Sequence, residues 1–266
     1  MLKILKVDKQ FQDFQLVIEN VELEQGKTYG LVGHNGAGKS TFLKCVAGII
    51  VPDKLTIYAD QRSLENPVDR RKLISFVPDR PALYDWMTVA EFVSFCTRME
   101  LGTLANMQAS LEQFEVPLTK KIQSLSHGMR SKLGLAISFA RSTPYVLMDE
   151  PLTGLDMRAR EEVIQIIKRF ASSDHAPRAV LLSTHSIADL ESFCDHIVIF
   201  KQGRCVLSSS LDDIRTGWLV EECGAKQSTG HANAKRLISI HSTASASPHC
   251  AQRRLATPLE VFLNLG

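Results

Sequence analysis

The sequence lacks any long apolar run. Its longest strongly apolar stretches, residues 179–182 and 197–200, have the length of a β-strand, whereas a membrane-spanning helix needs about 20 apolar residues. The N-terminus has lysines at positions 3 and 6 but no long apolar segment behind them, so we find no secretory signal peptide. We therefore expect a cytoplasmic protein that is held at a membrane, if at all, by a partner.

An excess of charge of one sign is also missing. The chain has 31 Lys and Arg against 29 Asp and Glu, which gives a net charge of +2. A protein that binds nucleic acid usually presents a strongly basic face. The composition therefore predicts no nucleic-acid partner.

Closely spaced cysteines are absent as well. The six cysteines include no CxxC pair and no metal-ligand spacing. That usage is typical of buried or incidental thiols in a reducing compartment. We therefore assign no site to Cys45, Cys96, Cys194, Cys205, Cys223 or Cys250.

What the sequence does contain is a series of short strands and helices. Residues 3–32 alternate apolar and polar side chains, which predicts short strands. A buried strand over residues 28–32 then leads into a glycine-rich loop and a helix over residues 41–49. The apolar positions that indicate the earlier strands are Leu16, Ile18, Val21 and Leu23.

The middle of the chain, about residues 89–118, has helical spacing and few strand signals. A second helical run begins near Met129. The expected apolar face of the first helix consists of Val89, Phe92, Val93, Cys96 and Met99.

From residue 145 onward, strands and helices alternate. We predict strands at Tyr145–Met148, 179–183 and 197–200, and helices at 158–170 and 187–193. This order favours an α/β fold with a mostly parallel sheet. The helical segment, about residues 80–143, is then an insert into that core.

The C-terminal part differs in composition. Residues 222–254 are rich in Ser, Ala, His, Lys and Arg and have weak periodicity, which is typical of a loosely packed tail or an irregular hairpin. Residues 258–263 have the pattern of a short amphipathic helix. We therefore expect a main domain over residues 1–215 and a C-terminal extension over residues 216–266.

The glycine-rich loop fits the phosphate-binding pattern G-x-x-x-x-G-K-[ST] and lies between a strand and a helix, as that pattern requires. Its glycines let backbone N–H groups converge on one anion at the positive end of the helix. Lys39 is expected to bridge the β- and γ-phosphates of a nucleotide, and Ser40 to bind Mg²⁺. The expected nucleotide-binding residues are Gly33, His34, Asn35, Gly36, Ala37, Gly38, Lys39, Ser40 and Thr41.

Two adjacent carboxylates follow the strand Tyr145–Met148. Asp149 fits the acid that holds Mg²⁺ in phosphate-loop ATPases. Glu150 is placed to orient and deprotonate the attacking water. Together with the loop these residues predict a nucleoside triphosphatase, a class that includes kinases, GTPases, helicases and transporters.

A pentapeptide between these two motifs, residues 125–129, reads Leu-Ser-His-Gly-Met. It resembles the signature sequence of ATP-binding-cassette (ABC) ATPases, whose commonest form is Leu-Ser-Gly-Gly-Gln. Ser126 and Gly128 at a helix start make a second anion-binding cap. The resemblance implies that the signature of one subunit closes on the ATP of another, so a homodimer or heterodimer with two shared sites is expected.

The rest of the chain is similar to the same family from about residue 3 to residue 215. Residues 151–156 resemble its D-loop, and His185 follows a strand as the family's switch histidine does. The resemblance implies that His185 contacts the γ-phosphate and acts with Glu150 in catalysis. It also implies a P-loop NTPase core, an N-terminal antiparallel β subdomain and an inserted α-helical subdomain.

Two positions depart from the family pattern. Asp79 stands where the family usually has a glutamine that touches Mg²⁺, and we retain it as a metal-binding candidate. Met129 stands where the signature usually ends in glutamine. Both departures resemble the ABC-2 type exporter branch.

An aromatic side chain from the N-terminal strands stacks on the adenine in this family. Phe11 is the best-placed candidate, with Phe14 behind it.

The resemblance implies an ATP-hydrolysing subunit that drives a separate transmembrane permease, and so lies at the inner face of the cell membrane. The alternative is a soluble ABC ATPase, for example one that acts in translation, DNA repair or iron–sulfur cluster assembly. The single cassette and the near-neutral charge disfavour the ABC ATPases that act on nucleic acid. A cluster-assembly subunit would also have a single cassette, so it is harder to distinguish from a transporter subunit.

Overall fold

The computed structural model describes residues 1–173, 176–185, 190–191, 193–223, 237–242 and 253–255. Ten strands of this part form one mixed sheet, in the order β5-β4-β1-β2-β10-β9-β3-β8-β7-β6. They are β1 (Leu2–Gln10), β2 (Gln15–Leu23), β3 (Thr28–Val32), β4 (Lys54–Ala59), β5 (Arg62–Ser63), β6 (Ile74–Val77), β7 (Tyr145–Met148), β8 (Ala179–Thr184), β9 (His196–Lys201) and β10 (Arg204–Ser210).

The parallel part of the sheet, β9-β3-β8-β7-β6, forms the centre of the fold. Strands β3, β7 and β8 are buried at every position, as expected where both faces of a parallel sheet are covered. Along β7 the side chains alternate between two apolar cores: Tyr145 and Leu147 join one, while Val146 and Met148 join the other. The α/β class with a parallel core is therefore confirmed.

One helix layer covers each face of this centre. Helix α1 (Lys39–Val46) contributes Phe42 and Leu43 to the core that also contains the N-terminal strands. Helix α6 (Met157–Ala171) contributes Val163 and Ile167 to the opposite core. The remaining helices are α2 (Pro67–Leu73), α3 (Val89–Arg98), α4 (Leu104–Gln113), the 3₁₀ helix η1 (Ile122–Ser124), α5 (His127–Ala140) and α8 (Leu211–Gly217).

The N-terminal strands β1, β2, β4 and β5 pair antiparallel and continue the same sheet. The apolar alternation of β2 changes phase at Asn20, which has a positive φ of 56°. This kink lets both halves of the strand bury their apolar side chains, because Leu16 and Ile18 lie before it and Val21 and Leu23 after it.

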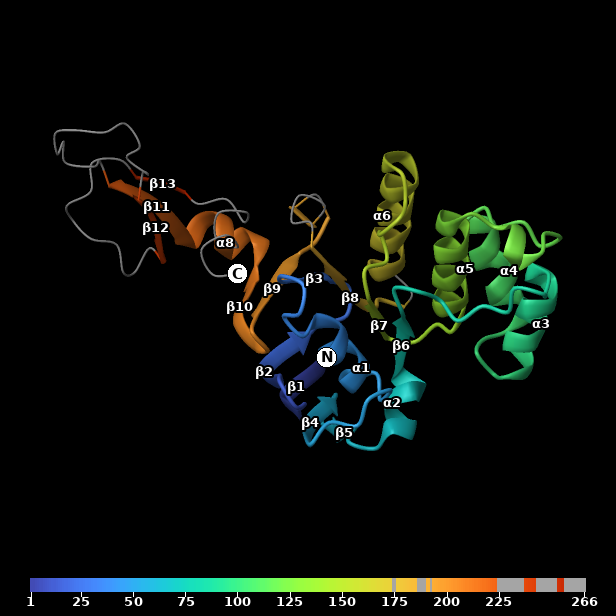
Figure 1. The fold of residues 1–266 in the computed structure, drawn as a ribbon, viewed down its shortest axis with the longest axis horizontal. Coiled ribbons are helices and arrows are strands. Elements are labelled where there is room, and N and C mark those ends of the chain that lie inside the picture. The colour runs from blue at the N-terminus through green and yellow to red at the C-terminus, as the bar shows by residue number, and fades with distance from the viewer. Residues whose placement is uncertain (174–175, 186–189, 192, 224–236, 243–252, 256–266) are drawn as a thin grey trace.

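Helices α3, α4 and α5 form a separate cluster beside the parallel sheet (Figure 1). Helix α3 begins with a capping box in which Thr88 and Glu91 each bind the other's backbone N–H, an arrangement that satisfies two otherwise unpaired donors. Four of the five expected apolar positions of α3 are buried. Met99 is the exception, with 58% exposure, because α3 ends at Arg98 and Met99 is only its C-cap.

Several elements differ from the sequence expectations. Helix α1 begins at Lys39 and ends at Val46, so it starts inside the phosphate-loop pattern rather than at residue 41. We did not predict β4, β5, α2, β6, β10 or α8, because these segments are short and lack a sustained apolar period. Most of the expected helix at 187–193 lies outside the described residues.

The C-terminal extension contains a second sheet. Strands β11 (Trp218–Cys223), β12 (Leu237–Ser242) and β13 (Arg253–Leu255) pair antiparallel in the order β12-β11-β13. Within residues 222–254 the described residues pair as antiparallel strands, which favours the expected hairpin over the loosely packed tail. The expected helix at 258–263 lies outside the described residues. None of the described helices is long and apolar enough to cross a membrane.

Candidate active site

The candidate site lies where β3, β7 and β8 end. Their parallel registers place Val32 beside Thr184 and Met148 beside Leu182. The segments that follow these strands therefore meet at one edge of the sheet, which is where open α/β sheets bind ligands.

The phosphate loop runs from Gly33 to Gly38 and ends at the start of α1. Gly38 has a φ of 100°, and a side chain there would lie 2.7 Å from Leu16 Cδ1. Lys39 folds back across the loop and donates from Nζ to Gly33 O at 2.6 Å. Its side chain is buried, and burial lowers the pKa of the Lys39 amine, while the negative charges of Glu150 and Asp149 act in the opposite direction.

Asp149 is the centre of a small hydrogen-bond array. Its Oδ1 accepts from Ser40 Oγ at 2.9 Å and from Ser183 Oγ at 2.8 Å. Its backbone N–H donates to Val77 O at 2.8 Å, which ties β7 to β6. The carboxylate is 4% exposed, so these hydroxyls replace the water that it gives up.

Glu150 leaves the strand in a left-handed conformation, with a φ of 50°. Its backbone N–H donates to Ser183 Oγ at 3.0 Å. Its Oε2 accepts from Thr153 Oγ1 at 3.2 Å and lies 3.0 Å from His185 Nδ1. Non-glycine residues with this backbone conformation are uncommon and often occur at active sites. The structure therefore brings Glu150 and His185 into contact.

Ser183 is a site residue to which we assigned no role from the sequence. It is fully buried and binds both the Asp149 carboxylate and the Glu150 backbone. A signal was present, because the parallel register that pairs Met148 with Leu182 places Ser183 next to Asp149. Using that signal requires knowing that β7 and β8 are neighbours.

Asp79 lies just after β6 and is exposed. Within the described residues its carboxylate makes no hydrogen bond or ion pair. Asp79 and Glu150 line the same small cavity, together with Ser131. The structure thus places Asp79 near the carboxylate pair but does not join it to Asp149.

The signature segment forms the start of α5. Ser126 is the N-cap, and its Oγ accepts from the backbone N–H of Met129 at 3.2 Å. Gly128 packs against Leu155 of the 151–156 loop. Helix α5 belongs to the helical cluster, whereas α1 lies on the other side of β6 and β7 (Figure 1). The two expected anion-binding caps therefore lie on different subdomains.

The two aromatic candidates lie close together, with ring centroids 6.4 Å apart. Phe11 is 40% exposed, and the Lys9 ammonium lies 5.8 Å from its ring centroid. Phe14 lies against the phosphate loop, because a side chain added at Gly38 would come within 2.9 Å of its ring. Phe11 thus has the open ring face and Phe14 the contact with the loop.

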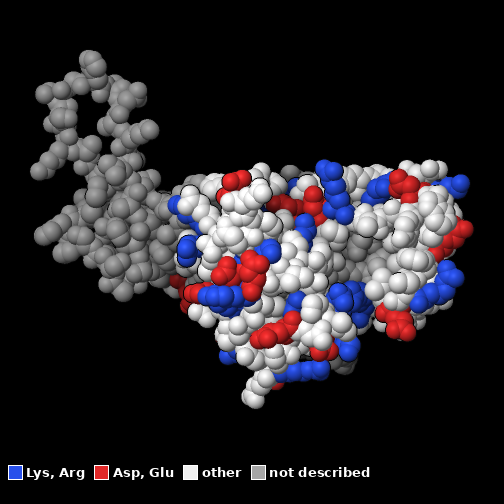
Figure 2. Space-filling model, turned by 60° about the horizontal axis from the view of Figure 1, so that its bottom comes forward, with Lys and Arg blue, Asp and Glu red and all other residues white. Residues whose placement is uncertain are grey.

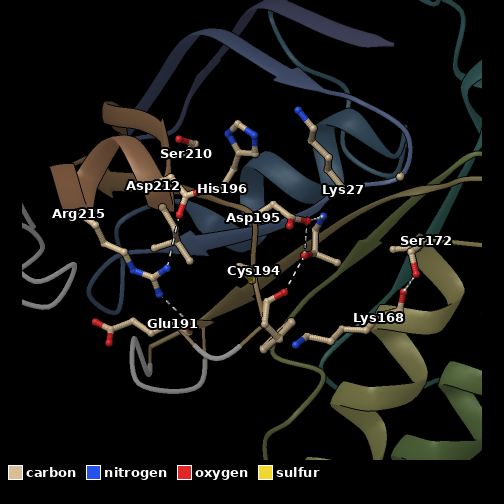
Figure 3. A pocket seen from close by; sticks show the side chains of 15 residues that line it. Lys27, Lys168, Ser172, Glu191, Cys194, Asp195, His196, Ser210, Asp212 and Arg215 are labelled. Carbon is tan, nitrogen blue, oxygen red and sulfur yellow. Dashed lines mark hydrogen bonds and ion pairs between the residues drawn. The ribbon is translucent and has the colours of Figure 1, made fainter. Parts of the chain in front are cut away.

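A larger hollow of about 650 Å³ lies at the other end of the strands (Figure 3). Asp195 Oδ2 accepts from the Thr28 backbone N–H at 2.7 Å and from Thr28 Oγ1 at 2.8 Å. Burial raises the pKa of the Cys194 thiol well above its ordinary value.

Lysines, arginines and acids are interspersed on the face of the molecule in Figure 2, so the described residues of that face form no continuous patch of one charge.

The residues at the site fit a magnesium ion. Ser40 Oγ and Asp149 Oδ1 are adjacent oxygen atoms 2.9 Å apart. Mg²⁺ prefers oxygen ligands and is usually held by one or two protein groups together with substrate phosphates. A glycine-rich loop with its lysine, followed by a helix and faced by these carboxylates, defines the class of P-loop NTPases.

Comparison with known proteins narrows that class. The family model for the ABC transporter domain matches residues 18–153, and a model for an AAA domain, a putative AbiEii toxin of a type IV toxin–antitoxin system, matches residues 118–189. The uncharacterized ABC transporter ATP-binding protein YxlF of Bacillus subtilis is 33% identical over 81% of this chain and 72% of its own length.

Solved structures have the same fold. The structure of an ATP-binding subunit of an ABC transporter has a TM-score of 0.71 and 27% identity, covering 81% of this chain and 92% of its own. A dimeric ATP-binding cassette in a post-hydrolysis state, bound to ADP and Pi, has a TM-score of 0.69 and 22% identity. The match covers 79% of this chain and 99% of that structure's chain. The chain therefore belongs to the ABC transporter family, as an ATP-binding ATPase domain.

Proposed function

We propose that this chain hydrolyses Mg·ATP as a dimer of cassettes and thereby drives a separate transmembrane permease, in the direction of export. The observation that carries the proposal is the continuous array of contacts from Ser40 through Asp149, Ser183 and Glu150 to His185. It joins a phosphate-binding loop to a group that can accept a proton from water.

In the proposed reaction the triphosphate of ATP lies along residues 33–41, where Lys39 turns from Gly33 O toward the phosphates. Water attacks the γ-phosphorus, the bond to the β–γ bridging oxygen breaks, and Glu150 takes the proton, leaving ADP and phosphate. His185 contacts the γ-phosphate and holds Glu150. Ser40, Asp149 and Asp79 are the groups that would hold Mg²⁺, which neutralises charge on the phosphate oxygens when bound. Phe11 stacks on the adenine.

The dimer is proposed because the signature and the phosphate loop of one chain lie on different subdomains. Ser126 caps a helix of the helical cluster, whereas Gly38 and Lys39 begin a helix across the sheet. In a head-to-tail pair, Ser126 and Gly128 of one subunit reach the γ-phosphate held by the other. The dimeric cassette among the solved structures has the same fold.

The proposed permease contact is the segment before α3, from Asp79 to Thr88. Trp86 is 68% exposed, and Tyr84 packs edge-on against Phe95 while 46% exposed itself. Exposed aromatic groups of this kind are enriched at protein interfaces. Asp79 and Met129 support the ABC-2 exporter branch, and docking on a permease places the chain at the inner face of the cell membrane.

The central test is Glu150→Gln, which keeps the shape of the side chain but removes the base. Turnover of ATP should fall by about 10²- to 10⁴-fold, while gel filtration with Mg·ATP should show a stable dimer. The matched control, Glu112→Gln on the exposed face of α4, should turn over ATP at the wild-type rate. Hydrolysis by the Glu150→Gln variant at the wild-type rate would show that Glu150 is not the base.

The permease contact has a separate test. Detergent-solubilised membranes from cells that express the tagged chain should yield an integral membrane protein of several apolar spans. Trp86→Ser should reduce its recovery without changing ATP turnover. A chain recovered only from cytosol, with no membrane protein attached, would remove the transport part of the proposal and leave the ATPase part intact.

A further inference from the structure

His127 of the signature segment packs on the 151–156 loop, which directly follows Glu150, the proposed catalytic base. It is the first residue of α5, and its side chain is exposed. A Cβ atom added at Gly154 would lie 2.7 Å from His127 Cδ2 and 2.8 Å from Nε2. The imidazole ring therefore occupies the space beside Gly154, which has a positive φ of 76° and no side chain of its own.

The loop under this ring leads directly to Glu150. Thr153, the neighbour of Gly154, donates from Oγ1 to Glu150 Oε2 at 3.2 Å and from its backbone N–H to Glu150 O at 3.1 Å. A shift of Gly154 is therefore transmitted through Thr153 to the carboxylate. His127 is thus connected to the proposed base through its ring contact with Gly154, the peptide link to Thr153 and the Thr153 hydroxyl.

The other side of His127 is the proposed binding cap. Ser126 precedes it in the chain, and the His127 carbonyl accepts from Ser131 Oγ at 3.2 Å within the first turn of α5. The backbone of His127 is thus part of the turn that carries Ser126. The imidazole ring on Gly154 and the Ser126 cap therefore belong to the same turn.

We infer that His127 is a positioning residue that couples the two nucleotide sites of the dimer. When Ser126 of one subunit engages the γ-phosphate held by its partner, the His127 ring presses the 151–156 loop into the position that aligns Glu150 of its own subunit. The inference rests on the proposed dimer. It assigns the coupling to the packing of the ring, because packing is the contact that the geometry shows between His127 and Gly154.

The test compares His127→Ala with His127→Phe in the full-length chain. Removing the ring should lower kcat by about 2- to 30-fold, the range typical of residues that carry coupling. A phenyl ring keeps the packing surface without the nitrogens, so His127→Phe should retain kcat within about 2-fold of wild type on the same criterion. Gln123→Ala, an exposed change just before the signature, is the control and should leave kcat unchanged.

A binding measurement separates positioning from nucleotide contact. In the Glu150→Gln background, His127→Ala should change the ATP concentration for half-maximal dimerisation by less than about 2-fold, because Ser126 remains. Wild-type kcat in His127→Ala would overturn the inference. So would a kcat of His127→Phe as low as that of His127→Ala, or a large loss of ATP-driven dimerisation.

The same experiment distinguishes failure of the proposed dimer from failure of the role of His127. If Glu150→Gln alone does not dimerise with ATP, the proposed dimer fails and the coupling fails with it. If Glu150→Gln dimerises normally but His127→Ala turns over ATP at the wild-type rate, only the role of His127 is lost.

Discussion

The parallel strands of the central sheet have polar groups at both ends, and the two ends are built differently. At the carboxyl ends, Asp149 and Glu150 are tied to groups from β8 and α1, and a lysine is buried beside them. At the amino ends, Thr28 and Asp195 bind each other in the wall of a much larger hollow (Figure 3).

The larger hollow therefore does not lie at the end of the sheet that carries the phosphate loop. The amino end has more open volume, but two of the acids that line it, Asp195 and Asp212, pair with nearby donors within the fold. The carboxyl end has a helix start, glycines and a strained glutamate, which are features that a ligand would use. If the two ends serve catalysis and stability separately, a substitution at each end should change only one of these properties.

The largest effect is expected from Lys39→Ala at the carboxyl end. Loss of the ammonium removes the charge that faces the phosphates, so ATP turnover should fall by at least about 100-fold. Steady-state phosphate release and binding of a fluorescent ATP analogue measure this. Lys44→Ala, in the last turn of the same helix, is the control and should stay near wild type.

A smaller effect on turnover is expected from Ser183→Ala, because the hydroxyl supports Asp149 and Glu150 without touching ATP. Activity should fall by about 10- to 100-fold, as for groups that orient metal ligands. Urea unfolding should show a loss of about 1–3 kcal/mol from the buried groups left unpaired. Ser138→Ala is the matched control, since its buried hydroxyl has no hydrogen-bond partner among the residues that the structure describes. Equal effects of the two variants would contradict the support role.

Substitutions at the amino end should change the stability of the fold and leave ATP turnover unchanged. Asp195→Ala leaves the Thr28 backbone N–H without its acceptor, so the free energy of unfolding should fall by about 1–3 kcal/mol. The kcat per folded molecule should remain at the wild-type value. Asp212→Ala, an exposed acid of the same hollow, should change stability by less than about 1 kcal/mol. A large drop in kcat for Asp195→Ala would show that the two ends are not separate.

The smallest expected effect is a pH dependence of the folding stability, caused by His196 at the amino end. Burial lowers the pKa of His196 below its usual 6.5, with Lys27 adding to the shift. The unfolded chain then binds a proton more readily than the folded chain, so stability is complete above about pH 6.5 and falls as the pH drops below it. His196→Phe keeps the stacking on Tyr29 and should lose less stability between pH 7.5 and pH 5.5 in urea titrations. An unchanged pH dependence would contradict this assignment.

The central strands and the phosphate loop were predictable from the sequence because their signals are local. Residues 28–32, 145–148 and 179–184 are short, apolar and flanked by turn residues or glycine. By contrast, α2 and β6 follow one another without a break, with charged residues up to Lys72. They are stabilised by their neighbours, since β6 pairs with β7 and Arg70 of α2 donates to Leu64 O.

The sequence by itself determined the class of chemistry, because the phosphate loop, the Asp149–Glu150 pair and the signature are contiguous motifs whose residue types dictate what they bind. Only the tertiary structure decided which side chains meet. Ser183 reaches Asp149 because β7 and β8 are parallel neighbours, and His127 reaches Gly154 because α5 packs beside the loop that follows β7. Such contacts depend on strand order and helix placement, which no local pattern encodes.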